Sequence, residues 1–189
     1  MIKDILVSLK VSTRESPAEK YAISMAAALE AHMAGITFAF DPIELMSPLS
    51  YMGGSLAEKE LPDWRGEANA TLDRFSEAAV RSAISPERLM LPADLTSIGD
   101  QFGRIARRFD LSVVARPEAE GAPVESVIVE GALFDSGRPV IVVPYIQTVP
   151  FKLGRVMICW DGSRPAVRAM ADAMPLLALA ESTEVVIVR

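Results

Sequence analysis

The sequence predicts an α/β fold, with a five-stranded parallel sheet and helices on both faces, plus a partial second β-α-β unit. Short apolar segments alternate with amphipathic helical segments over residues 1–146, which is typical of β-α-β units. The apolar segments are nearly continuous, which indicates strands buried on both faces. After residue 153 the opening pattern begins again, and repetition of this length indicates a duplicated unit.

Five strands are expected where short apolar runs are bounded by polar or turn-forming residues: 5–9, 36–40, 88–91, 111–115 and 140–143. The first helix is expected to begin at Ser16-Pro17, because serine caps free amides and proline fits the first helical turn. It should run to about His32 and end at Gly35. Gly137 is expected to end the last helix. The helices after the second strand are expected at 62–83, 93–109 and 124–136.

The chain is divided into three parts by this pattern. Residues 1–146 form a complete domain, 147–153 a linker, and 154–189 a partial second domain with strand, helix and strand. About 36 residues bury too little apolar surface to fold alone. The partial domain should therefore dock on the first domain, pair with another chain, or be the start of a longer protein, and we favour the last.

Composition excludes several classes of protein. The net charge of −6 is opposite to the basic excess typical of nucleic-acid binding. A lone cysteine, Cys159, allows no internal disulfide, which is typical of a reducing compartment. The sequence contains neither a signal-peptide pattern nor an apolar run of the ~20 residues that span a bilayer. We expect a cytoplasmic protein without nucleic-acid or membrane partners.

Three segments carry a likeness to a known family: the opening apolar strand with Lys10-Val11-Ser12, the closing stretch 136–144, and the stretch from Val156 to Ser163. In this order they resemble the universal stress protein family. The resemblance covers 1–146 as a whole domain and 154–189 as a partial one. It implies a Rossmann-like fold, a role in stress response, and the tandem type of the family with its second domain truncated.

Many members of that family bind ATP, through an aspartate after the first strand and a glycine-rich stretch after the fourth. Glycines let backbone amides approach phosphates. Here Lys10 stands where the aspartate would be, and Ala115, Glu118 and Ile128-Val129 stand where the family has its glycines and Gly-Ser. The resemblance therefore implies a degenerate nucleotide-binding site in the first domain.

The second copy keeps the family's Asp-Gly-Ser as Asp161, Gly162 and Ser163. These residues are the candidate cofactor-binding residues, and ATP is the candidate cofactor. The alternative is that Asp161 has no role in binding and is an ordinary turn residue, because Asp-Gly is common in turns. No catalytic residue and no metal ligand is expected.

The leading hypothesis is a non-enzymatic stress-response or regulatory module that acts on an unidentified protein partner, with no cofactor. The alternative is an ATP-binding sensor that uses Asp161 and a completed or domain-exchanged second unit. An enzyme of a related nucleotide-binding class is a third hypothesis. It is disfavoured because the sequence has no Walker-type loop and no nucleophile-elbow motif.

A homodimer is expected, through the strand Val140–Val143 or through the partial second unit. Several single residues have structural explanations that we prefer to functional ones. His32, the only histidine, is expected near a helix end. Cys159 is expected to be buried in a strand. Lys10, Ser12 and Arg14 form either an anion site or a solvated loop, and the loop is favoured.

Overall fold

The computed structural model describes residues 1–40, 63–93, 96–117 and 123–187. The expected loop at 41–61, Pro62 and Glu118 lie outside these residues. In chain order the elements are β1 (Asp4–Ser8), α1 (Pro17–Leu29), β2 (His32–Phe40), α4 (Trp64–Arg81), β3 (Glu87–Ala93), α5 (Ile98–Ala106), β4 (Leu111–Ala115), α6 (Pro123–Glu130), the π-helical turn η1 (Gly131–Asp135), β5 (Val140–Val143), β6 (Arg155–Trp160), α7 (Arg164–Leu177) and β7 (Ser182–Ile187).

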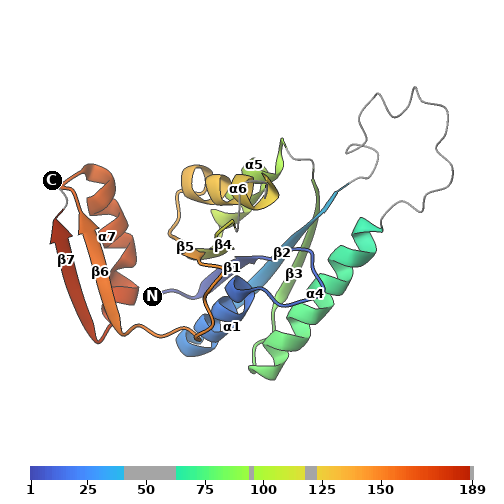
Figure 1. Ribbon diagram of the computed structural model, residues 1–189, viewed down its shortest axis with the longest axis horizontal. Helices are drawn as coiled ribbons and strands as arrows, with labels where there is room; N and C mark the ends of the chain where they lie inside the picture. The colour runs from blue at the N-terminus through green and yellow to red at the C-terminus, as the bar shows by residue number, and fades with distance from the viewer. Residues whose placement is uncertain (41–62, 94–95, 118–122, 188–189) are drawn as a thin grey trace.

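The first five strands form one parallel sheet in the order β3-β2-β1-β4-β5 (Figure 1). From β1 the chain proceeds toward β2 and β3, and from β4 it proceeds toward β5. The connections therefore diverge between β1 and β4, and their carboxyl ends border a crevice where open α/β sheets bind ligands. The predicted five-stranded parallel sheet is confirmed.

Two cores lie on opposite faces of this sheet. Ile5 and Val7 of β1 belong to the core under α1 and α4, which contains Phe75. Leu6 belongs to the core under α5 and α6, which contains Phe102. Adjacent residues of one strand point to opposite faces. A strand covered on both sides must therefore be apolar at every position, which explains the continuous apolar runs of the sequence.

The junction between α1 and β2 differs from the prediction. Ser16 caps α1 as expected, with its hydroxyl oxygen accepting a hydrogen bond from the Glu19 amide at 3.1 Å. The helix ends at Leu29, because Glu30 adopts a left-handed φ of 50°. Gly35 is therefore not a helix terminator. It lies inside β2, where a Cβ atom would overlap the Phe75 ring of α4.

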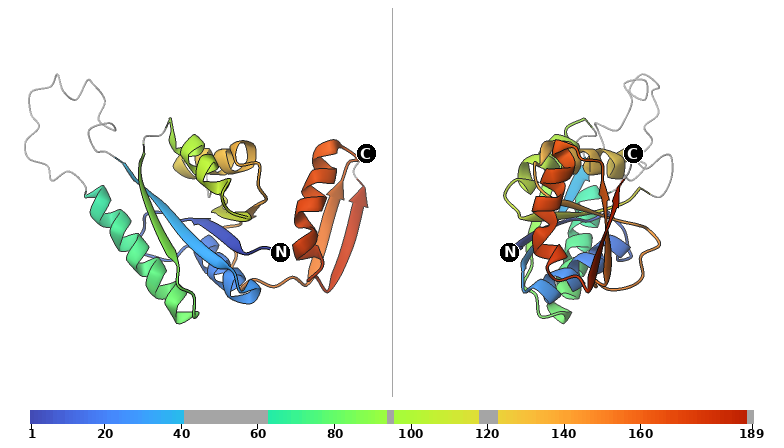
Figure 2. Two further views of the ribbon diagram at one scale, coloured as in Figure 1. Left: turned by 180° about the vertical axis from the view of Figure 1, so that it is seen from behind. Right: turned by 90° about the vertical axis from the view of Figure 1, so that its left-hand side faces the viewer.

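The second unit forms a separate parallel sheet of β6 and β7, and α7 contacts β6. It lies outside the helix-sheet-helix layers of the first domain (Figures 1 and 2). Leu176 of α7 packs against the core under α1, and the linker residue Phe151 meets the Tyr21 ring edge-on at a centroid distance of 5.7 Å. No residue of α7 is buried.

The prediction that Cys159 is buried is wrong, because it lies in β6 with its side chain exposed.

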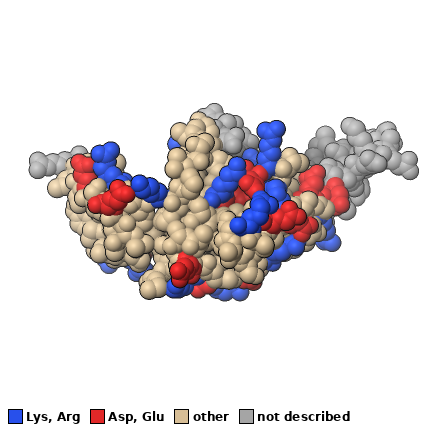
Figure 3. All heavy atoms as spheres, turned by 90° about the horizontal axis from the view of Figure 1, so that it is seen from below, with Lys and Arg blue, Asp and Glu red and all other residues tan. Residues whose placement is uncertain are grey.

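Charged side chains are mixed on the surface drawn in Figure 3. Lys and Arg lie among Asp and Glu there, around an area of other residues. That face offers no continuous basic surface of the kind that binds nucleic acid. In the described part of the chain, no helix is both long enough and apolar enough to cross a membrane.

Candidate functional site

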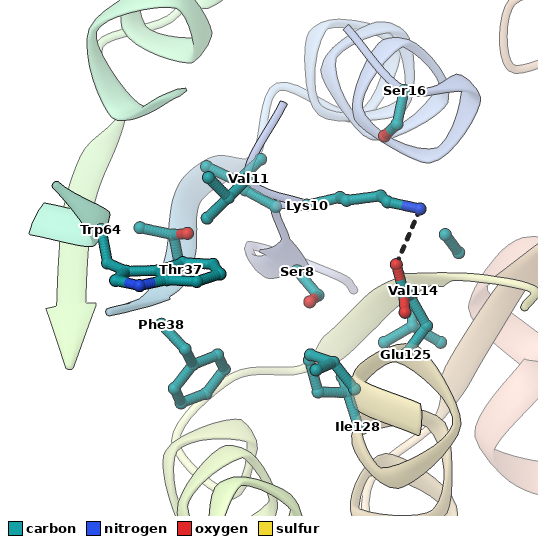
Figure 4. A pocket seen from close by; sticks show the side chains of 13 residues that line it. Ser8, Lys10, Val11, Ser16, Thr37, Phe38, Trp64, Val114, Glu125 and Ile128 are labelled. Carbon is teal, nitrogen blue, oxygen red and sulfur yellow. Dashed lines mark ion pairs between the residues drawn. The ribbon is translucent and has the colours of Figure 1, made fainter. Parts of the chain in front are cut away.

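A cavity of about 180 Å³ opens at the carboxyl ends of β1, β2 and β4. Ser8 ends β1, Thr37 and Phe38 lie near the end of β2, and Val114 and Ala115 end β4. The cavity thus occupies the crevice between the diverging connections, which is the expected ligand position of this fold. Its remaining walls come from the loop after β1 and from the first turns of α1, α4 and α6 (Figure 4).

One ion pair closes the side of the cavity next to α6. The Nζ atom of Lys10 lies 2.9 Å from Oε1 of Glu125 (Figure 4). The Glu125 side chain is only 18% exposed, whereas that of Lys10 is 50% exposed. Glu125 lies in the first turn of α6, where a carboxylate is favoured by the helix dipole. The chain's own carboxylate therefore occupies the helix end that binds an anion in many nucleotide sites.

The wall on the α6 side is apolar. Ile128 is 5% exposed and packs into the core under α5 and α6. Val124 lines the same wall one turn earlier, and Val114 of β4 lies beside it. Ile128 stands at one of the positions where the resemblance places a glycine. Its side chain fills space that a backbone approaching a phosphate would need.

Among the lining residues that the structure describes, Thr37 contributes the one polar group that is buried without a partner. The residue is 0% exposed, and within the described parts of the chain its Oγ1 atom has no hydrogen-bond partner. In Figure 4 this hydroxyl points toward the middle of the cavity, between the Trp64 ring and Val11. A buried hydroxyl without a partner carries a desolvation cost.

Asp161, Gly162 and Ser163 lie in the turn between β6 and α7, in the second unit. The Asp161 Oδ1 atom accepts a hydrogen bond from the Ser163 amide at 2.8 Å, and Gly162 has a left-handed φ of 77°. The Ser163 hydroxyl accepts one from the Ala166 amide at 3.2 Å and so caps α7. Hydrogen bonds from Ser163 hold the pKa of the Asp161 carboxyl below its ordinary value. The three residues thus build a turn and a helix cap. The described residues that line the cavity above all come from the first domain.

The other predicted residues have local roles. His32 begins β2, and its Nδ1 atom lies 3.2 Å from Oδ1 of Asp4. It follows the end of α1 at Leu29 by three residues, so it is near a helix end as expected, and it lies at the end of the sheet opposite the cavity. Ser12 accepts a hydrogen bond from the Arg74 guanidinium through its carbonyl oxygen. The described residues hold no group of three or more His, Cys, Asp or Glu side chains that could bind a metal ion.

Sequence reasoning did not identify Thr37, Trp64 or Glu125 as site residues. Glu125 could have been found from the sequence. Pro123 indicates the start of a helix, so an acid two residues later is expected in the first helical turn. Thr37 and Trp64 had none. They meet only because β2 and the start of α4 lie next to the end of β1 in the folded chain.

No protein-family model matches the sequence, and no curated protein matches it. Among solved structures, the hypothetical protein MJ0577 is 14% identical with a TM-score of 0.52, over 76% of this chain and 96% of its own. PA1789 from Pseudomonas aeruginosa PAO1 and a candidate universal stress protein from Pseudomonas aeruginosa UCBPP-PA14 are each 16% identical with a TM-score of 0.56. Both matches span 98% of this chain and 60% of the other, so the similarity of fold extends over the second unit.

Proposed function

We propose that this chain, which has the universal stress protein fold, is a non-enzymatic regulatory module of that family whose first domain does not bind ATP. The observation that carries the proposal is the Lys10–Glu125 ion pair at the first turn of α6. Regulation by such a module requires that it binds another molecule. A protein partner is one candidate, and a second copy of the chain is another.

Electrostatics supports the exclusion of ATP. A triphosphate is strongly anionic, and it would have to approach the Glu125 carboxylate at the helix end. Lys10 is already neutralised by that carboxylate at 2.9 Å. Breaking the pair to bind phosphate would leave Glu125, which is 18% exposed, beside an anion. Like charges at such short range disfavour binding.

Steric fit supports the same conclusion. Phosphate loops bring backbone amides against the phosphate, and side chains are absent where the approach is closest. In this chain the Ile128 side chain, which packs into the core, lies where the resemblance places one of the family's glycines. Pro123, which begins α6, has no amide hydrogen to donate. The wall therefore offers apolar contact where a nucleotide needs donors.

The alternative function, an ATP sensor that uses Asp161, remains open to a direct test. The turn of Asp161 and Gly162 is exposed, and the resemblance assigns this motif to nucleotide binding. A nucleotide held there would need further groups from a completed second unit or from another chain.

The test is a calorimetric titration of the 189-residue chain with ATP and magnesium, beside Asp161→Ala and Lys10→Met. We expect no saturable binding by any of the three at about 1 mM ATP. Saturable ATP binding that is lost in Asp161→Ala would contradict the proposal and support the ATP sensor instead. Binding that only Lys10→Met abolishes would place ATP in the first domain and overturn the proposal outright.

A further inference from the structure

We propose that the cavity at the carboxyl ends of β1, β2 and β4 binds an uncharged, planar aromatic molecule with one hydrogen-bond donor. This inference goes beyond the proposed function, which says only that ATP is excluded. It assigns to this cavity a ligand of a chemical class different from ATP. The argument rests on the size of the cavity, its walls, the Thr37 hydroxyl and the balance of charge.

The size of the cavity sets the size of the ligand. An apolar cavity of about 150 Å³ is large enough to hold benzene. The cavity here measures about 180 Å³, which suits one aromatic ring or two small fused rings. A nucleoside triphosphate is far larger, so most of it would have to lie outside.

The walls favour an aromatic ring. Trp64 and Phe38 stand on one side of the space and Ile128 and Val114 face them, each from a different element (Figure 4). Aromatic rings pack well against such groups, in offset or edge-to-face arrangements that add to the burial of apolar surface. Because the four side chains are held by β2, β4, α4 and α6, the space is formed by the fold itself.

The Thr37 hydroxyl provides the polar anchor. Its Oγ1 atom is buried, points toward the cavity and has no hydrogen-bond partner within the described residues. A ligand N–H or O–H group placed there would give this oxygen a partner. A site that presents a buried polar group discriminates strongly against ligands that cannot satisfy it.

The charge of the site indicates a neutral ligand. Lys10 and Glu125 neutralise each other at 2.9 Å, and no other charged side chain lines this cavity among the described residues. An anion would meet Glu125, and a cation would have to compete with Lys10 for the same carboxylate. A neutral ring leaves the pair intact, and its burial is favourable by the hydrophobic effect.

Indole is the probe we would use, because it combines two fused rings, no charge and one N–H group. Titration of the full chain, followed by protein NMR shifts, should give saturable binding with a Kd between about 10 μM and 1 mM. Thr37→Val keeps the shape and removes the hydroxyl, so we expect about five- to tenfold weaker binding. Indole-3-acetate, which adds a carboxylate, should bind more weakly than indole.

A matched pair of variants places the binding in the cavity. Val124→Phe fills the space next to α6 and should abolish indole binding, whereas Val80→Phe makes the same change on the exposed surface of α4 and should not alter it. Circular dichroism and melting of each variant confirm that it is folded. The proposal is overturned by the absence of saturation up to the solubility of indole. It is equally overturned by binding that survives Val124→Phe, or by tighter binding of indole-3-acetate. None of these outcomes affects the ATP titration, which tests the proposed function separately.

Discussion

Glu19 is a buried acid in the first turn of α1, at the centre of a small polar network. It is 1% exposed, and its Oε2 atom lies 3.1 Å from Nη2 of Arg74 on α4. The same oxygen accepts a hydrogen bond from the Ser16 amide at 3.4 Å, which completes a capping box. Glu19 thus joins the start of α1 to α4, next to the loop that carries Lys10.

Burial raises the pKa of Glu19 above its ordinary value of 4.5, and the nearby Arg74 only partly offsets this effect. A carboxyl whose pKa is higher in the folded state disfavours folding once it ionises. Its favourable contribution is complete below the pKa of the unfolded chain. That contribution is lost as the pH rises through the folded-state pKa.

For the variant Glu19→Gln, which cannot ionise, we therefore expect a flatter pH dependence of stability. The free energy of unfolding of the wild type, minus that of the variant, should fall as the pH rises from below 4.5 toward 7. Urea unfolding at a series of pH values measures this difference. A difference that rises with pH would show that the attraction of Arg74 outweighs the effect of burial.

At the scale of the elements, the packing of α4 against β2 depends on one small residue. Gly35 lies opposite the Phe75 ring, and an added Cβ atom there would also come within 2.9 Å of Leu9 Cδ1. Glycine lets the helix approach the sheet so closely that Phe75 becomes fully buried. The close approach, and not the end of a helix, explains the glycine at this position.

We predict that Gly35→Ala destabilises the protein by about 1–3 kcal/mol, as overpacking of a core typically does. Thermal and urea unfolding measure the loss. The double variant Gly35→Ala with Phe75→Leu should lose less than the sum of the two single changes, because the smaller side chain makes room. Gly154→Ala is the matched control, since its nearest neighbour would be the Glu181 carboxylate at 3.9 Å. Equal losses at positions 35 and 154 would contradict this explanation.

At the scale of the whole molecule, both sheets have strands that are open to pairing. β5 pairs with β4 only in the described part of the chain. In the second sheet, apolar side chains such as Met157, Val185 and Ile187 are exposed. Exposed strand edges and apolar patches of this kind are typical of surfaces that bind another chain. We keep the homodimer as a proposal, with β5 as its interface.

Val142 lies in β5 and is 37% exposed. A charge at this position should disrupt pairing of two β5 strands, so we predict that Val142→Asp is a monomer where the wild type is a dimer. Light scattering over a range of concentrations measures the change. Val80→Asp places the same charge on the exposed surface of α4 and should leave the dimer intact. If Val142→Asp still forms dimers, β5 is not the dimer interface, and the second unit becomes the next candidate.

Much of the fold was predictable because local signals and burial agree. The strands at 111–115 and 140–143 have their predicted bounds, since apolar runs between turn-forming residues leave few other choices. The junction at 30–35 was not predicted. The left-handed turn at Glu30 has no local signal, and the glycine that suggested a helix end is required by Phe75, which is distant in sequence.

The sequence by itself determined the parallel sheet, its two covered faces and the second strand-helix-strand unit. All of these depend on periodicity and on neighbours along the chain. Only the tertiary structure decided that Lys10 pairs with Glu125, that His32 lies far from the cavity, and that Thr37 and Trp64 lie side by side in its wall (Figure 4). Those contacts join residues tens of positions apart, and the sheet order that brings them together is set by packing of the whole domain.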